Sequence, residues 1–444
     1  DLGAGTEISQ EFVLSVLAGD DLQALFSRHF DWMMTTERLP RDRFRSARPS
    51  IGEAALVVEK KYARENWDER NELHATTCDP RSPHYYQTGW CGGGIADSAL
   101  LAGRNPLSRQ RAERALNQLC VGGQLASGFF YGKRSRDGDW QHDFQHDASR
   151  PYTHRWNLVR RQGDLLFYLL KSLHRPGLEA APESIERWRS SARRLADALC
   201  ALWHREGQWG QFIDAEEGRV LVGGSTSAGI VPAGLVLAYR EFKDERYLAT
   251  AEEGAHHFYG AFTRRGFSSG GPADACQAPD SESCAGLLES YVRLAEATGK
   301  EHWRKAACQQ AEQFASWVMP YDFPFPETTE FARQGIPTTG SVFANVQNKH
   351  SAPGICTHSG ECLRRLARLT GDDRYERLLG WIAGFLPWAM SREDRPIVAE
   401  DGRALPEGWI NERVNTSDWD DNVGGVFHGS CWCEVALLLT AVEV

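Results

Sequence analysis

The sequence of 444 residues contains no run of about 18 apolar residues, so it predicts no membrane-spanning helix and no membrane partner. It also has no excess of positive charge, because its formal net charge is −10, and this argues against a nucleic-acid partner. No phosphate-binding loop with its lysine is present. These absences direct attention to proteins that act on other classes of ligand.

The sequence has little sign of a disulfide framework. It has eleven cysteines, an odd number, and they are scattered along the chain. Several lie in helical patterns: Cys120, Cys200, Cys284, Cys308 and Cys362. Most are therefore expected to be small core residues in a reducing compartment. The chain starts at Asp1 with neither Met nor an apolar leader, which leaves a cytoplasmic and a periplasmic location both open.

Aromatic residues, by contrast, are abundant. There are 15 Trp, 12 Tyr and 20 Phe, and many stand in glycine-rich or charged segments where a core would not need them. Aromatic faces stack on sugar rings, which favours a carbohydrate ligand weakly. Packing of loops onto helices is an equally good explanation for any single residue.

One turn occurs three times, in Phe242–Tyr247, Thr298–Trp303 and Thr370–Tyr375. Each copy follows an apolar run, ends in an aromatic residue and precedes a second helical run. Gly299 and Gly371 fit the left-handed position that ends a helix, and the acids that follow fit the start of the next one. Each copy therefore predicts a helical hairpin with a short turn.

The same pattern predicts a closed ring of hairpins. Five pairs of helices are expected, at 93–103 with 107–122, 157–174 with 184–204, 228–241 with 245–262, 282–298 with 301–317, and 356–370 with 373–389. A sixth apolar helix, Cys433–Val442, needs an N-terminal partner from 22–37 or 50–63. The first helix of each pair is apolar nearly all round and the second is amphipathic, as for an inner and an outer ring. We therefore predict an all-α (α/α)6 barrel that occupies residues 1–444 as a single catalytic domain, with one short hairpin arm at 218–222.

The connections that lead into the inner helices are long, and turns out of them are short. The long ones are about 64–92, 123–156, 205–227, 263–281, 318–355 and 390–427. Loops of this length in a compact domain are usually functional. By topology they share one end of the barrel, where the N-termini of the inner helices favour anions. The site is expected there.

This architecture resembles the six-hairpin glycosidase superfamily over nearly the whole chain. Within it, the segments Gly408–Asn415, Ser417–Asp421 and Phe427–Glu434 resemble the β-glucuronidases of glycoside hydrolase family 154. The resemblance implies exo-acting removal of a glycosyl group, such as a β-linked uronic acid, from an oligosaccharide or glycoside.

Glycoside hydrolysis needs two carboxyl groups across the scissile bond. The long loops hold many, including Asp143, Asp147, Asp274, Asp280, Glu282, Glu330, Glu412, Asp418, Asp420 and Asp421. Asp280 fits a helix N-cap, while Glu282 opens an inner helix that faces the pocket. The cluster of three aspartates around Trp419 is expected to raise one pKa, as a general acid needs, although a solvated turn explains it equally. We predict Glu282 and Asp421 as the catalytic pair, with Asp418 as the next choice.

Cationic and aromatic loop residues are expected to bind the acidic sugar. Arg binds a carboxylate through two hydrogen bonds, and Lys, His and aromatic residues supplement it. The predicted substrate-binding residues are Tyr152, His154, Arg155, Trp156, Lys349, His350, His358, Arg413 and Trp419. Each one, taken singly, is as well explained as a surface or loop-bracing residue.

Neither a cofactor nor a metal ion is predicted. Glu282-Ser-Cys284 is similar to the Glu-x-Cys element of zinc-binding, cysteine-dependent β-L-arabinofuranosidases, which also implies the later cysteines, Cys356, Cys431 and Cys433. The chain lacks that family's adjacent Cys-Cys pair, and alternate positions point to different sides of a helix. A glycosidase of that zinc-dependent kind stays an alternative.

Three further functions stay open. A polysaccharide lyase would use Tyr152, His154 or His350 as its base. A sugar 2-epimerase would use a pair of histidines, and a non-catalytic glycan-binding protein would use none of these groups chemically. The sequence carries no prediction of oligomeric state.

Overall fold

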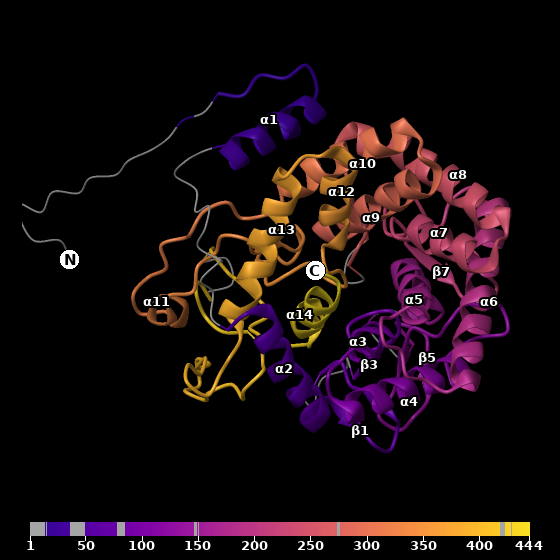
Figure 1. Ribbon diagram of the computed structural model, residues 1–444, viewed down its shortest axis with the longest axis horizontal. Helices are drawn as coiled ribbons and strands as arrows, with labels where there is room; N and C mark the ends of the chain where they lie inside the picture. Colours follow the sequence, from indigo (N-terminus) through magenta and orange to yellow (C-terminus); the bar gives the residue numbers. More distant parts are fainter. Residues whose placement is uncertain are drawn as a thin grey trace, which may run out of the picture.

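The structure is a computed structural model that describes residues 14, 16–35, 49–77, 85–145, 149, 151–272, 276–417, 422–427 and 429–444. Helices form most of it, in a ring (Figure 1). The helices are α1 (Leu22–Thr35), α2 (Ile51–Lys61), α3 (Ile95–Leu100), α4 (Pro106–Gly122), α5 (Val159–Ser172), α6 (Pro182–Glu206), α7 (Val231–Phe242), α8 (Glu245–Ala261), α9 (Ser281–Thr298), α10 (Glu301–Ala315), α11 (Glu330–Gln334), α12 (Glu361–Thr370), α13 (Arg374–Phe385) and α14 (Trp432–Glu443).

Short strands occur only in the connections, within the residues that the structure describes. They are β1 (Trp67–Asp68), β2 (Leu73–His74), β3 (Tyr86–Gln87), β4 (Lys133–Arg134), β5 (Trp140–Gln141), β6 (Trp156–Leu158), β7 (Phe212–Asp214), β8 (Arg219–Val222), β9 (Val342–Phe343) and β10 (Ser351–Ala352). They pair antiparallel in the orders β1-β2, β3-β4-β5, β6-β7-β8 and β10-β9. The arm predicted at 218–222 is confirmed as β8.

The predicted (α/α)6 barrel is confirmed. Among the described residues, the inner ring consists of α3, α5, α7, α9, α12 and α14, and α4, α6, α8, α10, α13 and α2 lie outside it (Figure 1). Of the two candidate partners for the last helix, α2 is the one that packs on α14. Helix α1 instead packs on the outside of α10, where Gln23 donates a hydrogen bond to the carbonyl of Gln309 at 3.0 Å. None of the described helices is long and apolar enough to cross a membrane.

The repeated turn anchors three hairpins for a local reason. Gly299 and Gly371 end α9 and α12 with φ of 66° and 72°, as predicted, and Asp244 caps α8 by accepting a hydrogen bond from the Arg246 amide at 3.0 Å. The aromatic residues that close the three turns, Tyr247, Trp303 and Tyr375, are all buried. Burial of each contributes about 3 kcal/mol, so the turn also fastens its outer helix to the core.

The inner helix α12 departs from its expected bounds of 356–370. Helix α12 begins at Glu361 and not near 356, because Thr357 and Gly360 take positive φ values of 63° and 79° and lead the chain into the barrel without helical turns.

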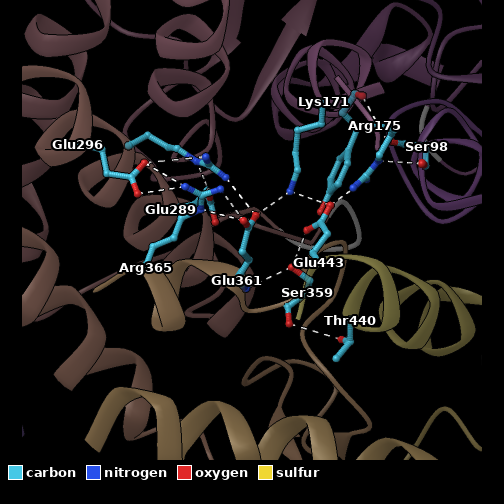
Figure 2. A network of polar contacts seen from close by, with 12 residues as sticks. Ser98, Lys171, Arg175, Glu289, Glu296, Ser359, Glu361, Arg365, Thr440 and Glu443 are labelled. Atoms are coloured by element: carbon cyan, nitrogen blue, oxygen red, sulfur yellow. Dashed lines mark hydrogen bonds and ion pairs between the residues drawn. The ribbon is translucent and has the colours of Figure 1, made fainter. Parts of the chain in front are cut away.

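Ion pairs close the ring between its last helix, α14, and α5. Glu443 of α14 lies 2.7 Å from Lys171 and 2.8 Å from Arg175 at the end of α5 (Figure 2).

Candidate functional site

A pocket of about 270 Å³ opens at the end of the barrel where α5 and α9 begin. Four of the long connections contribute to it, those around 64–92, 263–281, 318–355 and 390–427. Its lining residues are Gln87, Trp90, Leu158, Arg160, Arg161, Gly271, Pro272, Glu282, Ala344, Asn348, His350, Cys356, Glu412, Arg413, Phe427, Gly429, Ser430 and Trp432. We call this the central pocket. It combines aromatic surface with carboxylates and arginines, as small-ligand sites do.

The first turn of α5 places two arginines in the central pocket. Both follow β6, and both are largely buried. Arg161 forms an ion pair with Asp143 and donates a hydrogen bond to Gln87 Oε1 at 2.9 Å. Asp143 also accepts a hydrogen bond from the Leu158 amide at 2.7 Å, so this carboxylate fastens the 123–156 connection to α5.

The N-terminus of α9 places Glu282 in contact with Arg160, across the central pocket from α9 to α5. Asp280 is the N-cap, as predicted: it accepts hydrogen bonds from the Ser283 amide at 2.6 Å and the Gly271 amide at 3.0 Å. Burial raises the pKa of Asp280. Glu282 lies in the first turn, is buried, and forms an ion pair with Arg160. An arginine in contact favours the ionised form of a carboxyl group, whereas burial opposes it.

Glu412 supplies a second carboxyl group from a different wall of the central pocket. It lies in the connection before α14 and accepts hydrogen bonds from the amides of Gly429 and Ser430 at 3.0 and 2.9 Å. The indole of Trp432 donates to its other oxygen at 2.9 Å. Burial nevertheless raises the pKa of Glu412, because these donors only partly offset the loss of water.

Three predicted substrate-binding residues lie in or beside the central pocket. Arg413 lines it and lies over the ring of Phe427, 3.8 Å from the ring centre. His350 lines it too, with Nδ1 2.8 Å from the carbonyl oxygen of Ser351. Lys349 adjoins His350 with a positive φ of 56°, but its side chain is not among the lining residues.

The structure does not bring the 152–156 segment to the central pocket. His154 and Arg155 line a separate, open hollow of about 470 Å³ together with His142 and Glu216. Arg155 lies within 3.1 Å of three carboxylates, those of Asp214, Glu216 and Glu217, so it braces β7 and its turn. Tyr152 is 74% exposed, and its ring meets that of Trp156 edge-on at 6.0 Å.

His358 lies beneath the floor of the central pocket. It is buried, and its Nε2 is 3.7 Å from Oδ1 of Asp164 on α5. Burial lowers the pKa of His358 to about 4, so it is neutral at ordinary pH. The remaining predicted residues, Asp418, Trp419 and Asp421, lie outside the described residues.

The Glu-x-Cys element points in two directions. Glu282 faces the central pocket, whereas Cys284 is buried behind it and accepts a hydrogen bond from Gln310 Nε2 at 3.0 Å. Across the described parts of the chain, no three His, Cys, Asp or Glu side chains converge closely enough to hold a metal ion. The zinc-dependent alternative therefore has no support from the geometry of the described residues.

Sequence reasoning did not single out Arg160, Arg161 or the role of Glu412. The two arginines interrupt a run otherwise read as apolar, one turn from the mouth of an inner helix. Charge in the first turn of a helix that is buried on most sides was the available signal, because burial of an unpaired cation is costly. Glu412 was one of ten loop carboxyl groups, and no local pattern separated it from the others.

Comparisons with known proteins show the fold. The chain matches no protein-family model and no curated protein sequence. Among solved structures it is similar to a cellobiose 2-epimerase from Bacillus thermoamylovorans, with a TM-score of 0.54 and 11% identity over 88% of this chain and 98% of that one. It is also similar to a family 76 glycoside hydrolase from a bovine Bacteroides thetaiotaomicron strain, with a TM-score of 0.55 and 11% identity over 89% and 77%.

A third similar structure is an unsaturated glucuronyl hydrolase specific for heparin. It has a TM-score of 0.53 and 11% identity over 93% of this chain and 96% of that one. At these identities the similarity establishes the helical barrel, which glycoside hydrolases and sugar epimerases share. The resemblance to family 154 stays a prediction.

Proposed function

We propose that the protein is a carbohydrate-active enzyme, and specifically a glycoside hydrolase that removes a terminal β-linked uronic acid from an oligosaccharide or glycoside. The observation that carries the proposal is the pairing, in one small pocket, of two carboxyl groups with three arginines and aromatic surface. A volume of about 270 Å³ is at the small end for ligand pockets and suits one sugar unit, which favours exo action.

The two carboxyl groups differ in the way that glycoside hydrolysis needs. Glu282 forms an ion pair with Arg160, a contact that favours the ionised form and suits a nucleophile or base. Burial raises the pKa of Glu412, which suits a general acid that protonates the leaving oxygen. We propose this pair in place of Glu282 with Asp421, and Asp418 and Asp421 stay candidates for the acid.

The uronate would be bound by the positive side of the central pocket. Arg413 and His350 line it, and charge-assisted hydrogen bonds from arginine to a carboxylate are strong. The rings of Trp90, Phe427 and Trp432 offer apolar faces to the sugar ring. Arg160 and Arg161 are already engaged with Glu282 and Asp143, so they contribute positive potential more than direct contact.

The test compares aryl glycosides that differ only in the sugar. Aryl β-D-glucuronide should release its aryl alcohol, and the matching β-D-glucoside should react much more slowly. Glu282→Gln and Glu412→Gln should each lower kcat by about 10²–10⁴-fold. Glu330→Gln is the matched control, since Glu330 is a buried carboxylate of α11 that pairs with Arg333 outside the central pocket.

Further variants and substrates identify the general acid and distinguish hydrolysis from the competing reactions. If Asp418→Asn or Asp421→Asn abolishes turnover while Glu412→Gln does not, the acid is in the 418–421 segment. Because His350 lines the central pocket, a second candidate is epimerisation or β-elimination. NMR of free mannose or cellobiose detects the first, and absorbance of a new double bond in a uronate polymer detects the second. Turnover only in those assays would refute hydrolysis.

A further inference from the structure

A line of buried polar groups descends from the central pocket into the barrel along α5. Arg160 lies at its upper end in contact with Glu282, and Asp164 lies one turn below. Thr357, from the segment that precedes α12, lies between them. All of these side chains are buried, so their interactions are screened little by water.

The guanidinium of Arg160 is fully occupied by protein groups. Its Nε lies 3.3 Å from Oδ2 of Asp164. Its Nη1 contacts Glu282 and the carbonyl oxygen of Gly271, the latter at 3.2 Å. Its Nη2 donates to Thr357 Oγ1 at 2.9 Å and to the carbonyl oxygen of Cys356 at 3.3 Å. A guanidinium has five N–H groups, so Arg160 is committed to holding Glu282 and has no donor left for a sugar carboxylate.

Asp164 lies on the Nε side of this guanidinium, away from Glu282, and it is itself held in place. Thr357 Oγ1 donates to its Oδ2 at 3.0 Å, and the carbonyl of Thr357 accepts a hydrogen bond from Tyr168 at 2.6 Å. Thr357 keeps a φ of 63°, a conformation that costs a non-glycine residue energy and that persists only where its surroundings impose it.

The second oxygen of Asp164 faces His358. Neither Asp164 Oδ1 nor His358 Nε2 has a hydrogen-bond partner among the described residues, although both are buried. Buried polar atoms without hydrogen-bond partners are rare, because each one costs free energy of folding. Such an atom persists only where the surrounding packing fixes the side chain in place. The carboxylate is thus aimed at Arg160 by its packing and not by a second hydrogen bond on its other oxygen.

From this arrangement we infer that Asp164 is a positioning residue, which holds Arg160 against Glu282 and so keeps Glu282 ionised for the reaction. The inference rests on the proposed function for its chemistry, but the contact between these groups is a property of the protein alone. Without the anchor, Arg160 loses the interaction at Nε that fixes its orientation, so its Nη1 is no longer held against Glu282.

A second buried charge cluster in the same barrel provides a matched control. It lies two turns deeper on α9 and joins Glu289, Arg293, Glu361, Arg365, Lys171 and Glu443 (Figure 2). Glu289 is also buried, with 4% of its surface exposed against 0% for Asp164, and its carboxylate lies 2.6 Å from Arg293. Its removal costs stability by the same physics, yet it has no contact with Arg160 or Glu282.

Replacement of Asp164 can shift the titration midpoint of Glu282 in two ways, and the two shifts have opposite signs. The charged and titratable groups around Glu282 come from four elements. They are Arg160 and Arg161 from α5, with Asp164 behind Arg160; Asp280 from its own helix; His350 and Cys356 from the chain before α12; and Glu412 and Arg413 from the last connection. Loss of the negative charge of Asp164 by itself would favour the ionised form of Glu282 and lower its titration midpoint. Loss of the anchor would release Arg160 from Glu282 and raise the midpoint.

The experiment measures the titration of Glu282 directly, by NMR of full-length protein labelled with ¹³C at the glutamate side-chain carboxyl. The Glu282 signal is identified by its loss in Glu282→Gln. In Asp164→Ala we expect its midpoint to rise by about one pH unit or more. Asp164→Asn keeps an acceptor for Arg160 Nε and should shift it less. Glu289→Gln should leave it unchanged, and the kcat of Asp164→Ala should fall by about 10–100-fold with KM little changed.

An unchanged or lowered midpoint in Asp164→Ala would overturn the inference. If Asp164→Ala does not fold, Thr357→Val decides: it removes the hydroxyl that bridges Asp164 and Arg160, and it should raise the midpoint as well. The titration does not depend on turnover. Silence of the wild-type protein on every aryl glycoside would therefore refute the proposed function without touching this result.

Discussion

Replacement of Glu443 by Gln should destabilise the whole barrel from the last turn of its last helix. The Glu443 carboxylate is 3% exposed and lies 2.7 Å from Lys171, 2.8 Å from Arg175 and 2.6 Å from Ser359 Oγ. It thereby joins α14 to α5 and to the segment before α12 (Figure 2). Glutamine keeps the shape but leaves two buried cations with less compensation.

The magnitude follows from the burial. Removal of one partner from a buried ion pair costs about 3–5 kcal/mol, because the desolvation of the remaining charge is no longer offset. The entropy of unfolding of a chain of 444 residues is about 0.9 kcal/mol per kelvin. The expected fall in Tm is therefore about 3–5 °C.

The effect should depend on pH in a definite direction. Burial opposes ionisation of Glu443, but the ion pairs with Lys171 and Arg175 outweigh it and hold its pKa well below the usual range. A carboxyl group whose pKa is lower in the folded state stabilises the fold at pH values above its unfolded pKa, which is about 4.3. That contribution is lost as the pH falls through the folded pKa, so the difference between the proteins should narrow in acid.

Thermal unfolding followed by circular dichroism at pH 7 and at pH 3.5 provides the assay. Glu376→Gln is the control, because Glu376 pairs with Arg364 at 2.8 Å while 45% exposed, and such pairs contribute about 1 kcal/mol or less. If Glu443→Gln unfolds no earlier at pH 7 than Glu376→Gln, or if its deficit widens at low pH, the reasoning is refuted.

Three further outcomes are expected. Arg413→Gln should raise KM for aryl β-glucuronide about 10–100-fold and leave the glucoside nearly unaffected, since a charge-assisted hydrogen bond contributes about 1.5–3 kcal/mol; equal losses on both sugars would contradict a role in uronate binding. Gly89→Ala should lower both Tm and kcat, because φ is 61° and the new Cβ would lie 1.9 Å from the Arg161 carbonyl oxygen. Gly177→Ala is the control: it has open space around it and should lower the free energy of unfolding by only about 1 kcal/mol. The pKa of His358 is about 4 in the folded state, so between pH 6.5 and 4 only the unfolded chain binds the extra proton. The free energy of unfolding of the wild type should therefore fall by about 3 kcal/mol as the pH falls over that range, as measured by denaturant titrations. His358→Gln should make the free energy of unfolding nearly independent of pH there. A wild-type profile that is already flat there would disprove it.

The helical hairpins were predictable because their signals are local. A C-cap glycine such as Gly299, an N-cap such as Asp280 and a buried aromatic residue such as Trp303 each act within a turn or two of their own position. Apolar periodicity then sorts inner from outer helices, and the number of pairs leads to a closed ring. The position of Glu282 at the mouth of an inner helix followed from the same local reasoning.

The content of the central pocket was decided only by the tertiary structure. Its walls come from residues as far apart in the sequence as Gln87 and Trp432. The path of a long connection has no periodicity to report it, so Arg155 and Arg413 looked alike in the sequence, although one braces a turn among carboxylates and the other lines the pocket. The choice of α2 over α1 as the partner of α14 was likewise a matter of packing. Local sequence sets where helices begin and end, whereas which charges meet depends on how all six hairpins close around one axis.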